Sequence, residues 1–328
     1  MGYCITLKLI MKIPFLSHFF KHSGGHGPRM SVSFRGKSVL FVGVKRLGSK
    51  IQVVSFATRQ LTESTSQELA KICGALNLSG SNFSTLLGHG EYQLQVVEAP
   101  NVPTEELKSA VRWLIKDQLS YHVDEAMIDI LQIPSARQVT ERPKSLYVVA
   151  ASKDVINKRM GLFSSAKLEL NIIDIPEMAQ RNVAALFEDE GRALAVLAFD
   201  ETGGMLTFTS AGELYLARRI EITLGQLQDA DESLKKQYIE RLELEVQRSM
   251  DYFDRQFNHV TVSRLLVALP ARIGLVDALR ENLYVPVELL DLSQVLDISK
   301  MPELEGAEAQ FDAFYALGAA LRQESQKA

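Results

Sequence analysis

The sequence EYQLQVVEAPNVPTEELKSAVRWLIKDQLSYHVDEAMIDILQIP, residues 91–134, decides the fold class of this 328-residue chain. Its apolar pattern predicts a strand, a proline-bounded turn, an amphipathic helix that begins after Pro103, and a second strand. The apolar side of the helix is expected to hold Leu107, Ala110, Val111, Leu114 and Ile115, with Lys108, Arg112 and Lys116 on the opposite side. A helix of this kind packs on a sheet, so the stretch indicates an α/β protein.

The only tryptophan of the chain, Trp113, lies off the centre of that apolar side. Large aromatic side chains stabilise proteins mostly by burial, so one interpretation is an aromatic at the edge of the core. The other interpretation is a groove that binds a partner. Both fit the pattern.

Composition and charge exclude several classes of function. Apolar residues make up 46% of the chain and charged residues 23%, as in ordinary globular proteins. The net charge of -4 argues against a general nucleic-acid-binding protein, which would show a basic face. Cys4 and Cys73 cannot form a disulfide framework, which favours a reducing, cytoplasmic setting. No uninterrupted apolar run reaches the roughly 18 residues that a membrane-spanning helix needs.

Residues 1–36 are predicted to form an N-terminal tail. The tail is either flexible or, because residues 12–21 mix phenylalanine with lysine, a short amphipathic segment on a membrane surface. The glycine-rich residues 22–29 read as a linker. The triplet Gly36-Lys37-Ser38 resembles the end of a phosphate-binding loop, but it precedes its strand. Such a loop follows a strand, so the triplet is not expected to bind phosphate.

Two pairs of short apolar strands indicate an internal duplication. Residues 39–44 and 51–56 flank one turn, and residues 194–199 and 205–210 flank another turn 155 residues later. Two such units suggest two α/β halves with a common topology. Further helices are expected at 64–76, 153–168, 176–187, 231–257, 272–282 and 311–321. In the last of these, Ala316, Gly318, Ala319 and Ala320 permit a close backbone approach.

Four strings of the sequence resemble one protein family: RWLIKDQLSYHVDEAMIDILQIP (112–134), IIDIPEMAQRNVAAL (172–186), GELYLARRI (212–220) and RLELEVQRSMDYFDRQF (241–257). The family is that of the PilM-like proteins of type IV pilus biogenesis, in particular those of the mannose-sensitive haemagglutinin (MSHA) pilus. The resemblance covers roughly residues 37–322.

This resemblance implies an actin-like ATPase fold of the duplicated, ribonuclease H-like type, with an inserted small α/β subdomain. Residues 37–100 with 170–190 would form the first half, residues 101–169 the insert, and residues 191–324 the second half. Arg112-Trp113 and the Asp124-Glu125-Ala126 that follows the helix look like the family's motif in that insert.

The resemblance also implies a nucleotide pocket, in which two glycine hairpins hold phosphates and an aspartate in each organises Mg²⁺ or its waters. The first hairpin is expected at Gly43, Lys45, Gly48 and Ser49, and the second at Asp200, Gly203 and Gly204. Lys45 then stands in the place of the first aspartate, and a charged lysine cannot ligate Mg²⁺, although it can attract phosphate. The pocket is therefore expected to be vestigial, with no catalytic residue or metal ligand set, and with ATP and magnesium binding as the alternative.

Two functions follow from the resemblance. The first is a non-catalytic cytoplasmic scaffold, peripheral at the inner membrane, that binds the cytoplasmic segment of a PilN-like bitopic protein and other pilus assembly platform proteins. A groove beside Arg112 and Trp113, between the insert and the first half, is expected to hold that segment. The alternative is an active ATPase of the same assembly machine, in which Asp200 holds Mg²⁺ through water. Self-association into filaments is a third idea that no residue supports directly.

Overall fold

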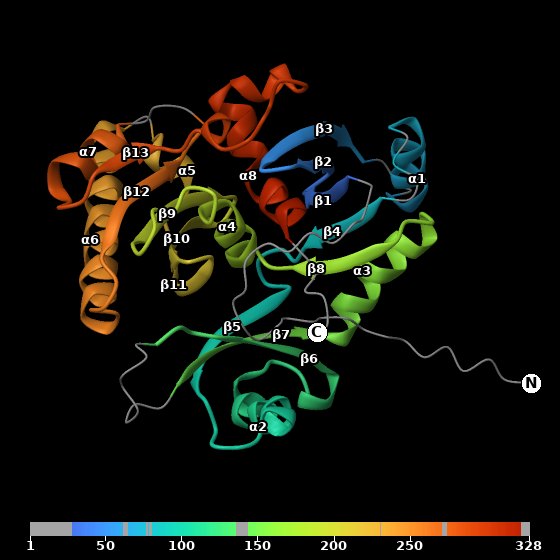
Figure 1. Ribbon diagram of the computed structural model, residues 1–328, viewed down its shortest axis with the longest axis horizontal. Helices are drawn as coiled ribbons and strands as arrows, with labels where there is room; N and C mark the ends of the chain where they lie inside the picture. Colours follow the sequence, from blue (N-terminus) through green and yellow to red (C-terminus); the bar gives the residue numbers. More distant parts are fainter. Residues whose placement is uncertain are drawn as a thin grey trace, which may run out of the picture.

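The computed structural model describes residues 28–61, 65–76, 78, 81–135, 144–229, 231–270 and 274–322. These residues form two five-stranded sheets, one three-stranded sheet and the helices that cover them (Figure 1). The predicted tail as far as residue 27 lies outside the described residues. Among the described helices, none is long and apolar enough to cross a membrane.

The first sheet has the strand order β3-β2-β1-β4-β8. Its strands are β1 (Arg29–Arg35), β2 (Ser38–Leu47), β3 (Lys50–Gln60), β4 (Asn82–Leu86) and β8 (Leu170–Asp174). The first three form an antiparallel meander, and β4 and β8 extend it in parallel from β1. The prediction that residues 1–36 form a tail is therefore wrong for β1, which is the central strand. Both faces of β1 are buried, so its serines lie inside with its apolar residues.

The second sheet repeats this topology, with the order β11-β10-β9-β12-β13. Its strands are β9 (Ala193–Asp200), β10 (Gly203–Ser210), β11 (Glu213–Ile220), β12 (Val262–Ala268) and β13 (Val287–Leu289). The predicted duplication is confirmed, but the predicted pairing of the repeats is one strand off. By topology, the hairpin β9–β10 corresponds to β1–β2 and not to β2–β3. The predicted repeats lack β1 because that strand lies within the predicted tail.

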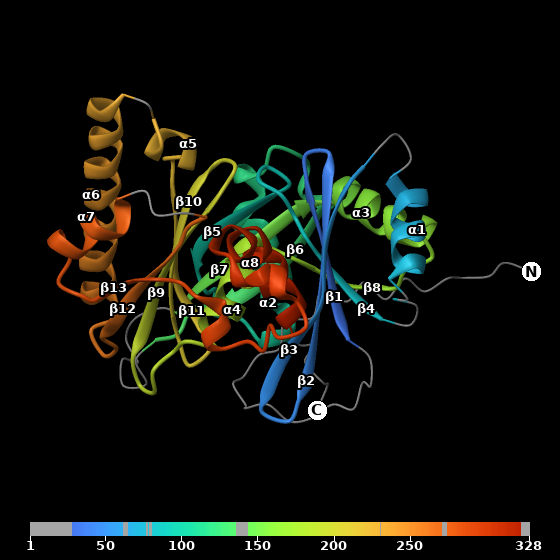
Figure 2. The same cartoon turned by 90° about the horizontal axis from the view of Figure 1, so that it is seen from above.

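Two helices, α4 (Pro176–Ala184) and α8 (Ala307–Leu321), lie between the large sheets (Figure 2). α8 packs on β1, β2 and β4 of the first sheet, whereas α4 packs on β9, β10 and β11 of the second, and the two helices pack on each other. Gly318 permits this contact, because a Cβ at that position would lie 2.1 Å from the carbonyl oxygen of Ala179. The close approach predicted for the small residues of the last helix is confirmed.

The third sheet has the order β5-β7-β6, and two of its strands come from residues 91–134. Its elements are β5 (Tyr92–Glu98), α2 (Thr104–Ile115), β6 (Ala126–Gln132) and β7 (Ser145–Ser152). One face packs on α2 through Val111 and Ile115. The opposite face joins the core of the second half, where the Ala217 N–H donates to the Tyr147 hydroxyl at 2.9 Å. The small sheet is thus sandwiched between its own helix and the second half.

The limits of this inserted unit differ from the predicted 101–169 at both ends. β5 was assigned to the first half, but it pairs along its whole length with β7 of the small sheet. At the other end, α3 (Lys153–Ser165) buries Phe163 in the core of the first sheet, beside α1 (Thr65–Ala75). The helix signals were read correctly, whereas the sheet to which each element belongs depends on pairing between distant segments.

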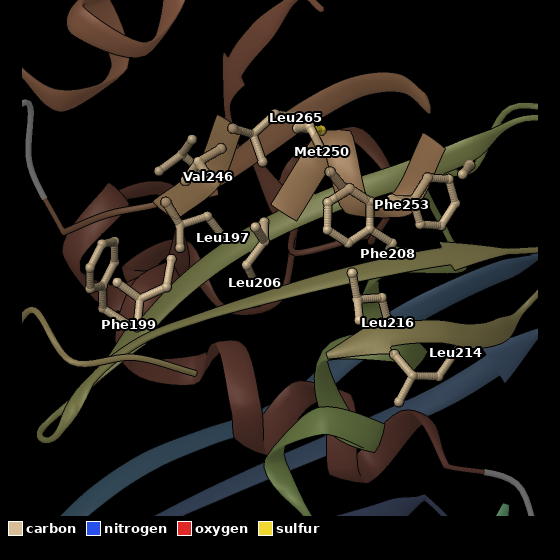
Figure 3. Close-up of a cluster of buried hydrophobic side chains, with 14 of the residues drawn as sticks. Leu197, Phe199, Leu206, Phe208, Leu214, Leu216, Val246, Met250, Phe253 and Leu265 are labelled. Carbon is tan, nitrogen blue, oxygen red and sulfur yellow. The ribbon is translucent and has the colours of Figure 1, made fainter. Parts of the chain in front are cut away.

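The core of the second half lies between its sheet and α6 (Glu232–Gln256), which is close to the helix predicted at 231–257. Phe208 of β10 stacks on Phe253 of α6 with the ring centroids 4.7 Å apart (Figure 3). Asp231 caps the helix by accepting the amides of Ser233 and Leu234. The short helix α5 (Leu224–Leu227) and helix α7 (Leu275–Asn282) also pack on α6.

Candidate functional site

The hairpin between β9 and β10 brings together Asp200, Gly203 and Gly204, as the sequence predicted. The Asp200 carboxylate accepts the amides of Thr202 at 2.7 Å and Gly203 at 3.2 Å and the Thr202 hydroxyl at 2.8 Å. Arg219, which lies on β11, forms an ion pair with the same oxygen. One carboxylate oxygen therefore closes the turn and neutralises an arginine.

This pairing sets the charge of Asp200. Burial opposes ionisation, but the hydrogen bonds from Arg219 and Thr202 outweigh it and lower the pKa of the carboxyl below its ordinary value. Asp200 is thus ionised at neutral pH and already faces a permanent cation. A divalent ion would have to displace Arg219 to use this oxygen.

The two glycines of the hairpin are explained by packing. Gly203 has φ +148°, and a Cβ there would lie 2.4 Å from the carbonyl oxygen of Ile220. A Cβ on Gly204 would lie 3.1 Å from the Phe199 ring. Both glycines therefore allow the turn to approach β11 and the Phe199 side chain, whether or not a ligand is bound.

The predicted first phosphate hairpin lies on β2 and in the turn to β3. Its residues are Gly43 and Lys45 on β2 and Gly48 and Ser49 in the turn. The prediction that Lys45 replaces the first aspartate is wrong. Arg35 ends β1 as Asp200 ends β9, and each is paired with the first residue of the next strand, Ser38 or Gly203. Lys45 lies seven residues beyond Ser38 on β2, about 23 Å at the rise of a strand.

Arg35 and the turn that follows it contain no carboxylate. The Arg35 guanidinium forms an ion pair with Asp312 of α8 at 2.8 Å. Gly36, with φ +51°, and Lys37 complete the turn to β2. The triplet Gly36-Lys37-Ser38 follows β1, so the prediction that it precedes its strand is wrong. It joins two antiparallel strands, and not a strand and a helix as a strand-to-helix phosphate loop does.

A buried polar network lies around α4, between the two large sheets, and was not predicted. Tyr92 donates its hydroxyl to Glu177 at 2.7 Å. Gln180 donates to the Val196 carbonyl at 2.8 Å and the Thr207 hydroxyl at 2.9 Å, and Tyr315 of α8 donates to Gln180. Burial raises the pKa of Glu177, although the Tyr92 hydrogen bond opposes that shift. No sequence signal marked these residues, because a polar residue in a helix or strand is commonly exposed.

A second buried cluster joins the insert to the end of α8. Asp129 of β6 lies 3.9 Å from the Lys108 ammonium of α2, and Asp174 lies 3.7 Å from the Arg322 guanidinium. Asp129 interacts electrostatically with both Asp174 and Arg322. Burial raises the pKa of Asp129 to about 6, against the opposing effects of Lys108 and the Ile130 N–H.

This shift predicts the pH dependence of stability. Between the unfolded pKa of about 3.9 and the native value of about 6, native Asp129 keeps a proton that the unfolded chain has lost. The free energy of unfolding should therefore fall as pH rises through that window, on the order of 2 kcal/mol from this group. Asp129→Asn should remove the dependence and be more stable than the wild type at pH 7. Urea unfolding of both proteins at several pH values measures these free energies. If the free energy of unfolding depends on pH in the same way in the two proteins, Asp129 is not the group responsible.

The predicted partner residues Arg112 and Trp113 lie together on α2 but play different roles. Arg112 donates to the Val123 carbonyl at 2.8 Å and so anchors the segment after the helix. Trp113 is 65% exposed, which excludes the interpretation as a core-edge aromatic. Leu114, expected on the packed side, is 50% exposed beside it, and the Lys116 ammonium lies 5.7 Å from the Trp113 ring centroid.

The predicted groove between the insert and the first half does not contain Trp113. Figure 1 shows α2 on the outer side of the small sheet, away from the first sheet. The buried contacts of α2 are with its own sheet. Trp113 and Leu114 therefore form an exposed apolar patch on the outer face of the insert, here called the α2 patch.

Comparisons with known proteins bear on the fold. No protein-family model matches the chain, and no curated protein matches it. Among solved structures, a chain of the PilM-PilN type IV pilus biogenesis complex matches with a TM-score of 0.69 at 17% identity, over 89% of this chain and 97% of that one. The chain thus has the fold that the sequence resemblance implied, an actin-like ATPase fold of two halves with the same strand order.

Two further structures are similar with lower scores. The cytoplasmic domain of EpsL, an inner membrane component of the type II secretion system of Vibrio cholerae, matches with a TM-score of 0.45 at 12% identity, over 74% of this chain and 82% of that one. A Bacteroides thetaiotaomicron protein with an actin-like ATPase fold and unknown function matches with a TM-score of 0.45 at 8% identity, over 84% of this chain and 95% of that one.

The residues of this actin-like fold do not fit the magnesium-nucleotide pocket that the sequence resemblance implied. Mg²⁺ requires hard oxygen ligands. The two corresponding hairpins offer the guanidinium of Arg35 and a carboxylate, Asp200, that Arg219 already neutralises. Within the described part of the chain, no group of three His, Cys, Asp or Glu side chains could hold a metal ion.

Proposed function

We propose that this chain is a PilM-like scaffold of type IV pilus assembly that binds the cytoplasmic segment of a PilN-like bitopic protein. It would lie in the cytoplasm, peripheral at the inner membrane, and contact other assembly platform proteins. The four sequence strings favour the MSHA pilus, with this chain in the role of MshI. The observation that carries the proposal is the match to a chain of the PilM-PilN complex over 97% of that chain.

The α2 patch supports a protein partner. Exposed tryptophan side chains are enriched among the residues that dominate binding energy, because they bury a large area at a low entropic cost. Trp113 and Leu114 present such a surface, with Lys116 at its edge. We place the PilN-like segment on this patch, with Trp113 as the anchor and Arg112 as the residue that holds the helix end in position.

The proposal includes no ATP hydrolysis. Two observations support the absence of ATP hydrolysis. Asp200 is paired with Arg219, and Arg35 stands in the equivalent place of the first half. The ATPase alternative has no observation in its favour among the described residues. The chain would then act as a non-catalytic scaffold whose actin-like fold presents surfaces that bind other proteins.

A titration with Mg-ATP is expected to give no saturable heat and no rise in the melting temperature. A ligand at a hundred times its dissociation constant would stabilise the native state by about 2.7 kcal/mol, so bound nucleotide would be evident. Saturable binding that is lost in Asp200→Asn, which retains an acceptor for the turn amides, would contradict the proposal and restore the ATPase alternative.

Co-purification tests the partner. The chain should be retained by a tagged, full-length PilN-like protein of the same organism in detergent-solubilised inner membranes. It should be lost when the cytoplasmic segment of that protein is deleted. Retention without that segment would place the contact elsewhere, and no retention in either case would contradict the function.

A further inference from the structure

The β2–β3 hairpin ends in an exposed tip whose composition differs from the rest of the surface. All six residues from Lys45 to Lys50 are exposed. The tip carries Lys45, Arg46 and Lys50, and Leu47 between them is 48% exposed. A leucine surrounded by cations at the apex of a hairpin is not explained by packing within the chain.

The tip extends beyond the rest of its sheet. The first residue of β1, Arg29, pairs with Val44 of β2, so the following residues of β2 run past the start of β1. The β2–β3 pairing continues to Leu47 and Lys50, which keeps the tip rigid. Figure 2 shows β2 and β3 running to this tip at the lower edge of the view. The tip therefore projects past the start of β1, where a flat layer can reach it.

The strands that lead to the tip carry basic side chains and no carboxylate. Residues 28–61 hold seven lysines and arginines and no aspartate or glutamate, and three of the seven cations lie at the tip. Asp297 is placed against the hairpin, but it accepts hydrogen bonds from Gln52 at 2.8 Å and the Ser299 hydroxyl at 2.6 Å. Asp297 also interacts electrostatically with Lys50, so it offsets part of the tip charge.

We propose that the tip of the β2–β3 hairpin, residues 45–50, docks on the surface of a bilayer that contains anionic lipid. Lysine and arginine near such a surface are attracted to its negative potential, and an apolar side chain between them can enter the boundary of the acyl chains. Leu47 would enter that boundary while Lys45, Arg46 and Lys50 lie among the headgroups. A nucleic acid or an acidic peptide would leave Leu47 without an apolar environment.

This inference deepens the peripheral membrane location proposed above, and it rests on that location for its biological meaning. It would orient the body with the β2–β3 turn, at one end of the strands of the first sheet, against the membrane. The α2 patch belongs to a different sheet, so lipid and partner could bind together. Lipid binding needs no PilN-like protein, and partner binding needs no vesicle, so the two proposals can fail separately.

Co-sedimentation of the full chain with vesicles tests the inference. Vesicles of equal parts phosphatidylglycerol and phosphatidylcholine should bind the wild type, and pure phosphatidylcholine should bind it far less. The triple variant Lys45→Gln, Arg46→Gln, Lys50→Gln should bind the anionic vesicles at least tenfold more weakly, since each cation near the surface contributes severalfold. The difference in vesicle binding between the wild type and the triple variant should become smaller in high salt, because salt screens the charges.

A matched variant changes the same number of charges elsewhere. Lys158→Gln, Lys236→Gln and Arg255→Gln lie on exposed faces of α3 and α6 and should leave binding unchanged. Equal losses in the two triple variants would mean that only net charge matters and would overturn the proposal. Unchanged binding in the hairpin variant would overturn it as well.

A second measurement reports insertion directly. In a Trp113→Phe background, Leu47→Trp places the only tryptophan at the tip. Its emission should shift to the blue with anionic vesicles and be quenched by brominated acyl chains. An emission spectrum unchanged by vesicles that do bind the protein would show that other residues make the contact, and would overturn the proposal.

Discussion

Replacing Gly318 by alanine is expected to destabilise the protein by about 3 kcal/mol or more, a large effect for one methyl group. The new Cβ would lie 2.1 Å from the carbonyl oxygen of Ala179, 2.5 Å from its carbonyl carbon and 2.9 Å from its Cα. These are backbone atoms of α4, so no rotamer change removes the overlap. α4 and α8 are each packed against a different large sheet, and separating them would open the hydrophobic core between the two sheets.

The control is the same substitution in another helix. A Cβ on Gly161 of α3 would meet nothing within 4 Å. Gly161→Ala should therefore stabilise the protein by about 0.5 to 1 kcal/mol, because alanine loses less backbone entropy in a helix. Urea unfolding of both variants measures the difference. Similar stabilities for Gly318→Ala and Gly161→Ala would mean that the helices between the sheets are not in close backbone contact.

Replacing Trp113 by alanine is expected to weaken binding of the PilN-like segment by roughly 30-fold, or about 2 kcal/mol, as for an interface residue that dominates affinity. The fold should be retained, with a change in stability within about 0.5 kcal/mol, because the side chain is 65% exposed in the free protein. Isothermal titration with the cytoplasmic segment and thermal unfolding give the two values. Leu114→Ala should weaken binding in the same direction by less.

An exposed aromatic elsewhere serves as the matched variant. Tyr284 is 62% exposed and hydrogen-bonds Asp254, in the second half of the molecule. Tyr284→Ala should leave affinity for the segment unchanged. If Trp113→Ala binds as tightly as Tyr284→Ala, the α2 patch is not the partner surface. If Trp113→Ala unfolds, the Trp113 side chain contributes to the folded core, which would contradict its position on the exposed surface of α2.

Local patterns predicted most elements of the fold, including α6 almost to its ends, because one helix face carries the apolar residues. The central strand β1 falls within the predicted tail because it directly follows the glycine-rich linker, although its alternating apolar residues and serines are typical of a strand. Both serines are buried, on a strand that α8 packs against, and α8 begins about 270 residues later in the chain. Burial of that face depends on a contact that no local window contains.

The candidate site shows the same limit. Asp200 and its glycines could be found from the strand-turn-strand pattern, whereas the ion pair with Arg219 depends on the register of β10 and β11, which shifts at a bulge between Phe208 and Thr209. The assignment of Lys45 failed because the missing strand moved the repeats out of register. The sequence left two interpretations of Trp113 open, because its outward direction depends on which face of α2 meets the small sheet.

The most direct test of the proposed scaffold role is a fluorescence titration of the full chain with the cytoplasmic segment of the PilN-like protein. Trp113 is the only tryptophan in the chain, so its emission reports the α2 patch alone provided that the segment contains none. We expect saturable binding with a blue shift, because an exposed indole becomes buried. Saturable binding with unchanged emission would move the partner to another surface, and no binding would contradict the scaffold role itself.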